Sequence, residues 1–562
     1  MGVVVVGGGG GEEAGMARRL WNQCKSEWIH ALYTPFFLSM ASGDLDSQSF
    51  LLHCVSQDVH FLKAFVQAFE LAEDCADDDD DRIAIKKLRK RVKEMLKNHD
   101  SLVREWGFEL PEESAPNVRT AKYTDFLLAT ASGKVEGERV PGKIATPFER
   151  TKVAAYTLGA IAPFMKLYAS ISREILDLLD PDDGSHLYKK WVEHYSSPSF
   201  EALALQTEEM VDKLSVSLTG EELEVLEKLY LQAMKLDVHC FSSQPIVQKT
   251  IVPLSELQEP SDCQFTIFCD FDMTCTAVDS SAILAEIAII TAPKHDRNGS
   301  ETQLIRMSSA DLRNTWGVLS TQYVQEYDQC IENIISSEGV EKYNYEGLSK
   351  ALEQLADFEK KANSRVIQSG GLNLEDINRA GHRLSLQDGC RGFFQKIVKH
   401  ENLKTDLHIL SYCWCGDLIR SSFSAGDLNV LKVHSNELVY EESISTGEIV
   451  TTVESPLEKL QAFEDVLKDR DTDGQPLTIY VGGSVGDLLC LLKADIGIVF
   501  GSSPSLRRLG DHFGVSFIPL YSGLVKKQRE FAEGGSGKWR RLPGTLYTVS
   551  SWAEIQAFIL GS

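Results

Sequence analysis

The sequence lacks a run of apolar residues long enough to cross a membrane. A transmembrane helix needs roughly 18 consecutive apolar residues, and the best candidate, "SAILAEIAIITA" at 281–292, is shorter and contains Glu286. Positive charge is also scarce, because 57 lysines and arginines face 82 acidic residues and leave a formal net charge of −25. A general binder of nucleic acid or acidic membranes needs a basic surface, so we expect neither partner. A small phosphorylated substrate remains compatible, because a bound metal ion can reverse the local field.

Paired cysteine motifs are missing as well. The twelve cysteines are scattered, without a CxxC pair or a zinc-finger spacing, so we expect reduced and mostly buried thiols in a reducing compartment. The N-terminus lacks signal-peptide anatomy, and its valine, glycine and glutamate runs predict a disordered leader over residues 1–15. The mildly basic "MARRLWNQCK" that follows leaves organelle import open. The predicted compartment is the cytoplasm, with mitochondria as a second location.

A chain of 562 residues is too long for one hydrophobic core, so several domains are expected. From 16 to 241 the apolar residues recur at intervals of three and four, which predicts an all-α helical bundle. A segment with three prolines follows, and we interpret residues 242–262 as a linker.

The pattern changes over residues 263–562. Compact apolar strands are predicted at 265–269, 407–412 and 477–483, each followed by a helical pattern. Buried strands that alternate with helices predict an α/β domain with a parallel sheet and right-handed crossovers. A long helical insert at about 280–400 separates the first two strands. We interpret it as a cap over the carboxyl ends of the strands, where ligands bind in such sheets.

Acidic residues follow the first predicted strand. Asp270 and Asp272 are two residues apart in "FCDFDMTCT", so in a continued strand they would lie on one face. Two carboxylates at a strand end suit phosphoryl transfer, because one can act as nucleophile while the other gives and takes a proton.

Three further pieces follow in chain order. Ser411 ends the second strand, where its hydroxyl could hold a phosphate oxygen. In "ESPLEKL", Ser455 is the expected N-cap of a helix, which sets Lys459 in the first turn. A lysine there can neutralise both carboxylates and a phosphate. The Gly-rich turn "GGSVGD" supplies Asp487 after the third strand.

This order of motifs resembles the haloacid dehalogenase (HAD) superfamily over about 263–562. The resemblance implies that Asp270 is the nucleophile, that Asp272 is the general acid and base, and that Ser411 and Lys459 bind the phosphoryl group. It also implies Mg²⁺, held by Asp270, the backbone carbonyl of Asp272, and acids of the last motif, here Asp487.

The last motif departs from the family pattern at one position. The family usually has two acids in this turn, and Gly483 stands where the first would be. Mg²⁺ needs only one or two protein carboxylates directly. Two outcomes stay open: a weaker site with Asp270, Asp487 and an extra water, or a crippled site.

The helical half offers acids among apolar residues and clustered aromatics. Asp58 and Glu227 lie in apolar helical patterns, and Tyr168 and Tyr195 lie in aromatic-rich segments. A buried acid needs a partner or a function. The order of these segments resembles the TenA family, helical heme-oxygenase-like proteins that hydrolyse aminopyrimidines in thiamin salvage.

The TenA resemblance, over about 16–241, implies roles for these residues. Asp58 and Glu227 would be the carboxylates that bind the pyrimidine, with Glu227 in the acid/base role, and Tyr168 and Tyr195 would be pocket aromatics. The nucleophilic cysteine of some members is replaced by Phe164, which indicates the cysteine-less branch.

The fusion of the two halves resembles the plant bifunctional thiamin-biosynthesis proteins. It implies a phosphatase for thiamin monophosphate joined to an aminopyrimidine hydrolase, with a homo-oligomer formed through the helical domain. Two alternatives stay open. One is a phosphatase of another small ester whose helical half only oligomerises, and the other is a non-catalytic binding protein of the thiamin pathway.

Overall fold

The structure is a computed structural model that describes the chain with several gaps. It covers residues 15–109, 115–134, 147–182, 184–242, 246–257, 264–291, 309–336, 339–340, 342–366, 371–424, 426, 428, 430–468, 476–535, 539 and 541–561. All but the last residue of the expected leader at 1–15 lies outside these ranges. Within the described residues, no helix is long and apolar enough to span a membrane.

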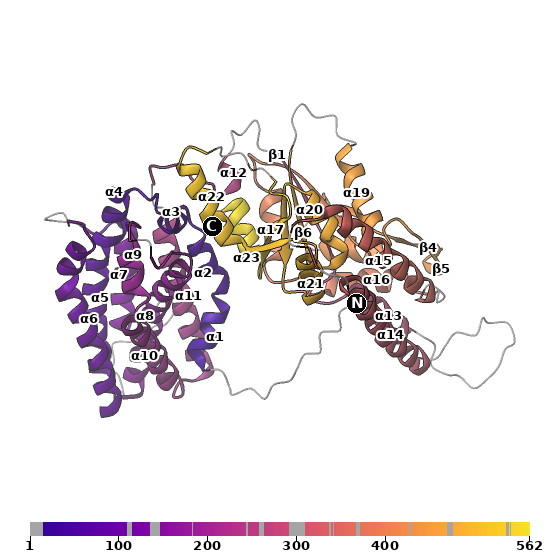
Figure 1. Cartoon of the computed structure of the whole chain (residues 1–562). Helices are drawn as coiled ribbons and strands as arrows, with labels where there is room; N and C mark the ends of the chain where they lie inside the picture. The colour runs from indigo at the N-terminus through magenta and orange to yellow at the C-terminus, as the bar shows by residue number, and fades with distance from the viewer. Residues whose placement is uncertain are drawn as a thin grey trace. The chain divides into compact units, whose positions relative to one another are not determined.

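The chain divides into two compact units (Figure 1). One contains Gln258–Gly523 and Ser536–Gln556, and the other contains Gly8–Leu257. Two short C-terminal segments, Leu524–Gly535 and Ala557–Ser562, group with the second unit. The sequence pattern had assigned the whole of 263–562 to one domain.

The helical unit confirms the predicted all-α class. Helix α8 is its longest, and the neighbours α5, α7, α10 and α11 pack against it. A π-helical turn, η1 (Leu51–Val55), runs directly into α5, and such turns often occur near functional sites. The helices are α1 (Met16–Gln23), α2 (Lys25–Leu32), α3 (Pro35–Ser42), α4 (Ser47–Phe50), α5 (Ser56–Cys75), α6 (Asp79–Glu105), α7 (Val118–Ala131), α8 (Pro147–Leu176), α9 (Lys189–Tyr195), α10 (Pro198–Ser215), α11 (Gly220–Ser242) and α12 (Leu254–Leu257).

The second unit is built on a seven-stranded sheet in the order β3-β2-β1-β6-β7-β9-β8, and the paired strands are parallel. The predicted parallel sheet is therefore confirmed. The strands are β1 (Gln264–Cys269), β2 (Lys404–Leu410), β3 (Lys432–His434), β6 (Leu477–Gly482), β7 (Ile496–Phe500), β8 (Ser516–Pro519) and β9 (Thr545–Val549), beside a hairpin of β4 (Glu437–Glu441) and β5 (Ile444–Val450). β1 lies between β2 and β6, so the ends of the first three predicted strands are adjacent.

The predicted helical cap is also present. α13 packs on α14 and α16, and α14 packs on α15. The cap helices are α13 (Ser280–Thr291), α14 (Ser309–Ile335), α15 (Tyr345–Val366) and α16 (Leu374–Arg383). The helices that accompany the sheet are α17 (Cys390–Val398), α18 (Gly416–Ser424), α19 (Pro456–Lys468), α20 (Leu488–Lys493) and α21 (Pro504–His512), with a short 3₁₀ turn η2 (Val485–Asp487). α22 (Leu520–Ala532) and α23 (Trp552–Leu560) begin in this unit and continue into the two segments that group with the helical unit.

Candidate active sites in the two units

Asp270 is fixed by the sheet itself. It follows β1 directly, and its backbone N–H donates a 2.9 Å hydrogen bond to the carbonyl of Val481 on β6. The side chain is only 4% exposed. The chain then turns sharply through Met273, whose φ of 59° lies in the left-handed region that non-glycine residues rarely adopt. Asp272 lies immediately before this residue, near enough to Asp270 for the charge of Asp270 to raise its pKa.

Lys459 joins the two predicted acids of the sheet edge. Its ammonium lies 2.8 Å from Asp270 Oδ1 and 2.6 Å from Asp487 Oδ1, and the side chain is fully buried. Ser455 is the N-cap, as predicted, and accepts a hydrogen bond from the Glu458 N–H. The Glu458 carboxylate reaches back to the N–H of Glu454, one residue before the cap. The capped helix start therefore aims Lys459 at the strand ends.

Asp487 is surrounded by protein donors. Its Oδ1 accepts from Lys459 and from the hydroxyl of Tyr480 at 2.8 Å. Its Oδ2 accepts from the N–H of Gly483 and from both the N–H and the hydroxyl of Ser484, at 2.7–3.1 Å. A carboxylate offers about four lone-pair positions, so five donors saturate it. Asp487 therefore closes the Gly-rich turn and holds Lys459.

The pKa values of both strand-end acids are raised above the ordinary value of a carboxyl. Burial and the neighbouring Asp487 raise the pKa of Asp270 to about 7, while Lys459 opposes the rise. Burial, then Asp279 and Asp270, raise the pKa of Asp272 to about 8. Hydrogen bonds from the N–H and hydroxyl of Ser280 orient the Asp272 carboxyl. A carboxyl with this pKa keeps its proton near neutral pH and can donate it.

A cavity of about 650 Å³ opens onto these acids. It is lined by Asp270 and Asp272, by the turn at 483–486, by the segment 412–414 after β2, and by α14 and α15 of the cap. Lys459 and Ser411 are fully buried and are not among the lining residues. The Ser411 hydroxyl accepts a 3.0 Å hydrogen bond from the Cys413 N–H, so its role in phosphate binding stays a prediction.

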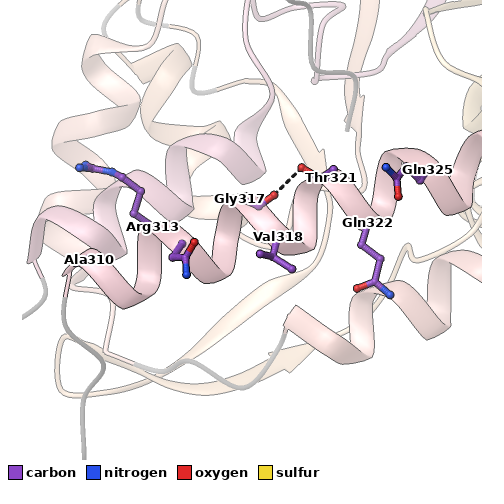
Figure 2. A pocket seen from close by; sticks show the side chains of 8 residues that line it. Ala310, Arg313, Gly317, Val318, Thr321, Gln322 and Gln325 are labelled. Carbon is purple, nitrogen blue, oxygen red and sulfur yellow. Dashed lines mark hydrogen bonds between the residues drawn. The ribbon is translucent and has the colours of Figure 1, made fainter.

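A second hollow, of about 740 Å³, lies along the outer side of α14 (Figure 2). Its lining comes from α14 alone and contains Arg313 and the exposed Val318. Thr321 bonds back to the carbonyl of Gly317 within the same helix. No carboxylate lines this hollow among the described residues, so the cavity at the strand ends is the candidate active site.

The helical unit brings Asp58, Tyr168 and Tyr195 together. Asp58 is 1% exposed on α5, and the hydroxyl of Tyr195 donates a 2.9 Å hydrogen bond to its Oδ2. The Tyr168 ring lies 5.1 Å from that of Tyr195 and stacks on Phe164 at 4.2 Å. Burial raises the pKa of Asp58 to about 7 against this single hydrogen bond. Within the described residues, Asp58 Oδ1 has no hydrogen-bond partner.

The expectation that Glu227 is a buried acid is wrong. Its side chain is 40% exposed, accepts a hydrogen bond from Gln23 and lies 3.7 Å from Arg19. On the same helix, Asp237 is 1% exposed, and burial raises its pKa well above the usual range. Position 227 faces partly outward, whereas 237 continues the buried stripe that includes Ala233, Met234 and Cys240.

Asp237 is the acid that sequence reasoning missed. Burial raises the pKa of Tyr168, and the charges that raise it further include both Asp58 and Asp237. The two carboxylates therefore act on the same tyrosine. Asp237 Oδ2 also has no hydrogen-bond partner among the described residues. The available signal was the position of an acid on the apolar stripe of the helix.

Comparison with known proteins finds matches to the helical unit and to the whole chain. The TENA/THI-4/PQQC family model matches residues 17–135 and 148–241. A protein of Arabidopsis thaliana named "Bifunctional TH2 protein, mitochondrial" is 58% identical over 556 residues, which cover 98% of this chain and 90% of the relative. The chain belongs to the family of bifunctional TH2 proteins.

Other matches of this TH2-family chain cover one half each. An aminopyrimidine aminohydrolase of Helicobacter pylori is 22% identical over 223 residues, 38% of this chain and 92% of the relative. A TenA homologue from P. horikoshii covers 41% of this chain and 97% of its own, with 19% identity and a TM-score of 0.33. A phospho-aspartyl intermediate analogue of phosphoserine phosphatase covers 43% and 90%, with 15% identity and a TM-score of 0.27.

The HAD resemblance of this TH2-family chain implies Mg²⁺, and the residues fit it in part. Asp270 lines the cavity, and the one contact of its Oδ2 within the described residues is a long 3.5 Å hydrogen bond from the Thr274 hydroxyl. Asp487 is saturated, Gly483 brings no carboxylate, and the described residues hold no group of three acids, histidines or cysteines placed for a metal. An ion at this site would be held by Asp270 and the Asp272 carbonyl, with phosphate and water completing its ligands.

Proposed function

We propose that the α/β unit is a phosphatase that converts thiamin monophosphate to thiamin and phosphate through an aspartyl-phosphate. The observation that carries this proposal is the buried Asp270, held by Lys459 and flanked by Asp272, whose pKa of about 8 keeps its proton available. Membership of the bifunctional TH2 family supports the link to thiamin, because the two halves would then serve one metabolite.

The residues divide the reaction between them. An oxygen of Asp270 attacks phosphorus as the bond to the leaving oxygen breaks, and Asp272 gives that oxygen its proton. The ionised Asp272 then takes a proton from water, whose oxygen attacks phosphorus, releases phosphate and restores Asp270. Asp270 and the Asp272 carbonyl would hold Mg²⁺, which neutralises phosphate oxygens when bound. Lys459 and Asp487 keep Asp270 in place, and the phosphoryl contacts expected of Ser411 and Lys459 remain part of the proposal.

For the helical unit, the proposal is hydrolysis of an aminopyrimidine. Asp58 and Asp237 would bind the ring and carry its protons, with Asp237 in the role first expected of Glu227. Tyr168 and Tyr195 would stack against the ring and orient Asp58. Support comes from the two buried carboxylates beside one tyrosine and from the aminohydrolase relative.

The decisive experiment follows phosphate release from thiamin monophosphate by the full chain, in Mg²⁺ and in EDTA. Selective, Mg²⁺-dependent release supports the proposal. Release only from nucleotide or sugar phosphates would favour a phosphatase of another small ester. No release at high Mg²⁺ would favour the remaining alternative, a non-catalytic binding protein of the thiamin pathway. The cytoplasm, mitochondria and a homo-oligomer through the helical unit remain proposals, tested by imaging of a tagged chain and by light scattering.

A further inference from the structure

The cavity over Asp270 has an unusual charge. Among the described residues that line it there are six acids and no lysine, arginine or histidine. A phosphate monoester brings up to two negative charges, and like charges at close range repel. One metal ion and the buried Lys459 can offset the phosphate, but the described lining of the cavity adds no basic side chain to balance its remaining acids. The six acids are Asp270, Asp272, Asp279, Asp328, Glu359 and Glu454.

Aromatic rings accompany these acids. Trp316, Tyr323 and Tyr327 recur at intervals of seven and four along α14, which places them on one face of that helix. The Tyr323 and Tyr327 rings stack at 5.9 Å with an angle of 20° between their planes. Tyr412 and Trp414 line the cavity from the strand-end side. Aromatic faces attract cations and flat heteroaromatic rings, so the wall offers both features that a cationic ring requires.

Glu359 of α15 is the acid that is best placed to act on the organic part of a substrate. The hydroxyl of Tyr323 donates a 2.6 Å hydrogen bond to its Oε1, which fixes the carboxylate on the cavity wall. The side chain is half-buried, and burial raises its pKa. In the described part of the chain no cationic side chain forms a salt bridge with it, although Lys360, the next residue, pairs with Glu458.

We propose that Glu359, oriented by Tyr323, makes the cap selective for phosphate esters whose alcohol is a cationic heteroaromatic. The thiazolium of thiamin is such a group, so this inference rests on the proposed phosphatase function and names the contact that selects its substrate. Glu359 supplies the counter-charge, and the rings of α14 stack on the cation. A neutral aromatic ester can keep the stacking and loses the charge pair.

The test compares thiamin monophosphate with thiochrome monophosphate, its neutral oxidised form, in the full-length protein with Mg²⁺. Glu359→Gln should raise the KM for thiamin monophosphate about tenfold, the size of one charge-assisted contact, with kcat within about twofold. The KM for the neutral ester should stay unchanged. Tyr323→Phe should shift the same KM in the same direction by a smaller factor. The matched control is Glu353→Gln, an exposed acid on α15 outside the cavity.

Equal losses on both esters, or an unchanged KM for thiamin monophosphate in Glu359→Gln, would overturn the inference and leave the proposed function standing. A wild-type protein that cleaves neither thiamin ester but does cleave 2-(1-methylpyridinium-3-yl)ethyl phosphate would overturn the proposed function alone. The inference is then decided by that ester against its neutral isostere 2-(3-methylphenyl)ethyl phosphate, where Glu359→Gln must abolish the preference for the cation. A protein that cleaves none of the four esters overturns both.

Discussion

The two units bury their acids in opposite ways. In the α/β unit, Asp487 accepts five hydrogen bonds, and Asp270 is paired with a buried lysine. In the helical unit, Asp58 and Asp237 each keep one oxygen without a partner in the described structure. A buried acid without partners is costly. The difference teaches that the α/β site is preorganised by the protein, whereas the helical site leaves two carboxylate oxygens for a ligand or a buried water to satisfy.

The scaffolds explain this contrast. At a strand end, adjacent loops and a capped helix start supply backbone N–H groups, which Gly483 and Ser484 donate to Asp487. Within a helix, backbone N–H groups are already paired with carbonyls. An acid on a helix face is therefore satisfied by side chains, by water or by a ligand, and among the described residues Asp58 has one side-chain donor, Tyr195.

The largest expected effect is the loss of phosphatase activity in Asp270→Asn. Removing the nucleophile should lower phosphate release at least about 10³-fold. Aminopyrimidine hydrolysis by the same preparation should remain within about twofold, because the variant leaves the helical unit unchanged. A parallel loss of both activities, measured side by side, would mean that the two sites are not independent.

Asp272→Asn sharpens the chemistry of the preorganised site. The pKa of the Asp272 carboxyl is raised to about 8, so its protonated, proton-donating form is present below that pH and is lost as the pH rises through it. Thiamin monophosphate, with an alkoxide leaving group, should lose about 10²-fold or more in rate. p-Nitrophenyl phosphate, whose leaving group needs no proton, should lose much less. Equal losses on the two esters between pH 6 and 9 would remove Asp272 from the role of general acid.

Sequence reasoning succeeded where topology brings the residues together. Asp270, Lys459 and Asp487 are far apart in the chain, but adjacent parallel strands end at one edge, and a capping pattern sets the start of α19. It failed for Glu227 and Asp237, which lie on one helix. Both are acids among apolar residues, but only Asp237 lies on the apolar stripe that recurs at intervals of three and four, and this difference in phase was not used. The sequence also could not predict that Asp487 accepts five hydrogen bonds, because these depend on the position of Tyr480 and on the directions of backbone N–H groups.

Asp237→Asn tests the correction in the helical unit. If Asp237 binds and protonates the pyrimidine, Asp237→Asn should lower the rate of aminopyrimidine hydrolysis about 10²-fold. Glu227→Gln is the matched control on the same helix, and it should stay within about twofold because Glu227 is half-exposed. A loss in Glu227→Gln together with an active Asp237→Asn would restore the first assignment.

Asp58→Asn should stabilise the ligand-free helical unit while it removes binding of the pyrimidine. The pKa of Asp58 is about 7 in the folded protein, raised from 3.8 by burial. The unfolded chain therefore ionises this acid at a lower pH than the folded chain does, and the free energy of unfolding falls as the pH rises from about 4 to 7. The variant should gain about 1–3 kcal/mol at pH 8 and almost nothing at pH 4. Thermal unfolding at the two pH values measures the gain, and a destabilised variant at pH 8 would show that the protein already satisfies Asp58.

Gly483→Asp tests whether a second carboxylate in the Gly-rich turn can serve as a metal ligand. Gly483 lines the cavity, so the new carboxylate would add a ligand near Asp270 and should lower the Mg²⁺ concentration for half-maximal activity by about threefold to tenfold. A Cβ there would lie 2.8 Å from the carbonyl oxygen of Phe500, so β7 must shift at a cost of about 1 kcal/mol. Gly483→Ala carries the same Cβ without the charge and should show the stability loss alone. If both variants leave the Mg²⁺ requirement unchanged, the turn is not a metal position, and Asp487 serves only to hold Lys459 against Asp270.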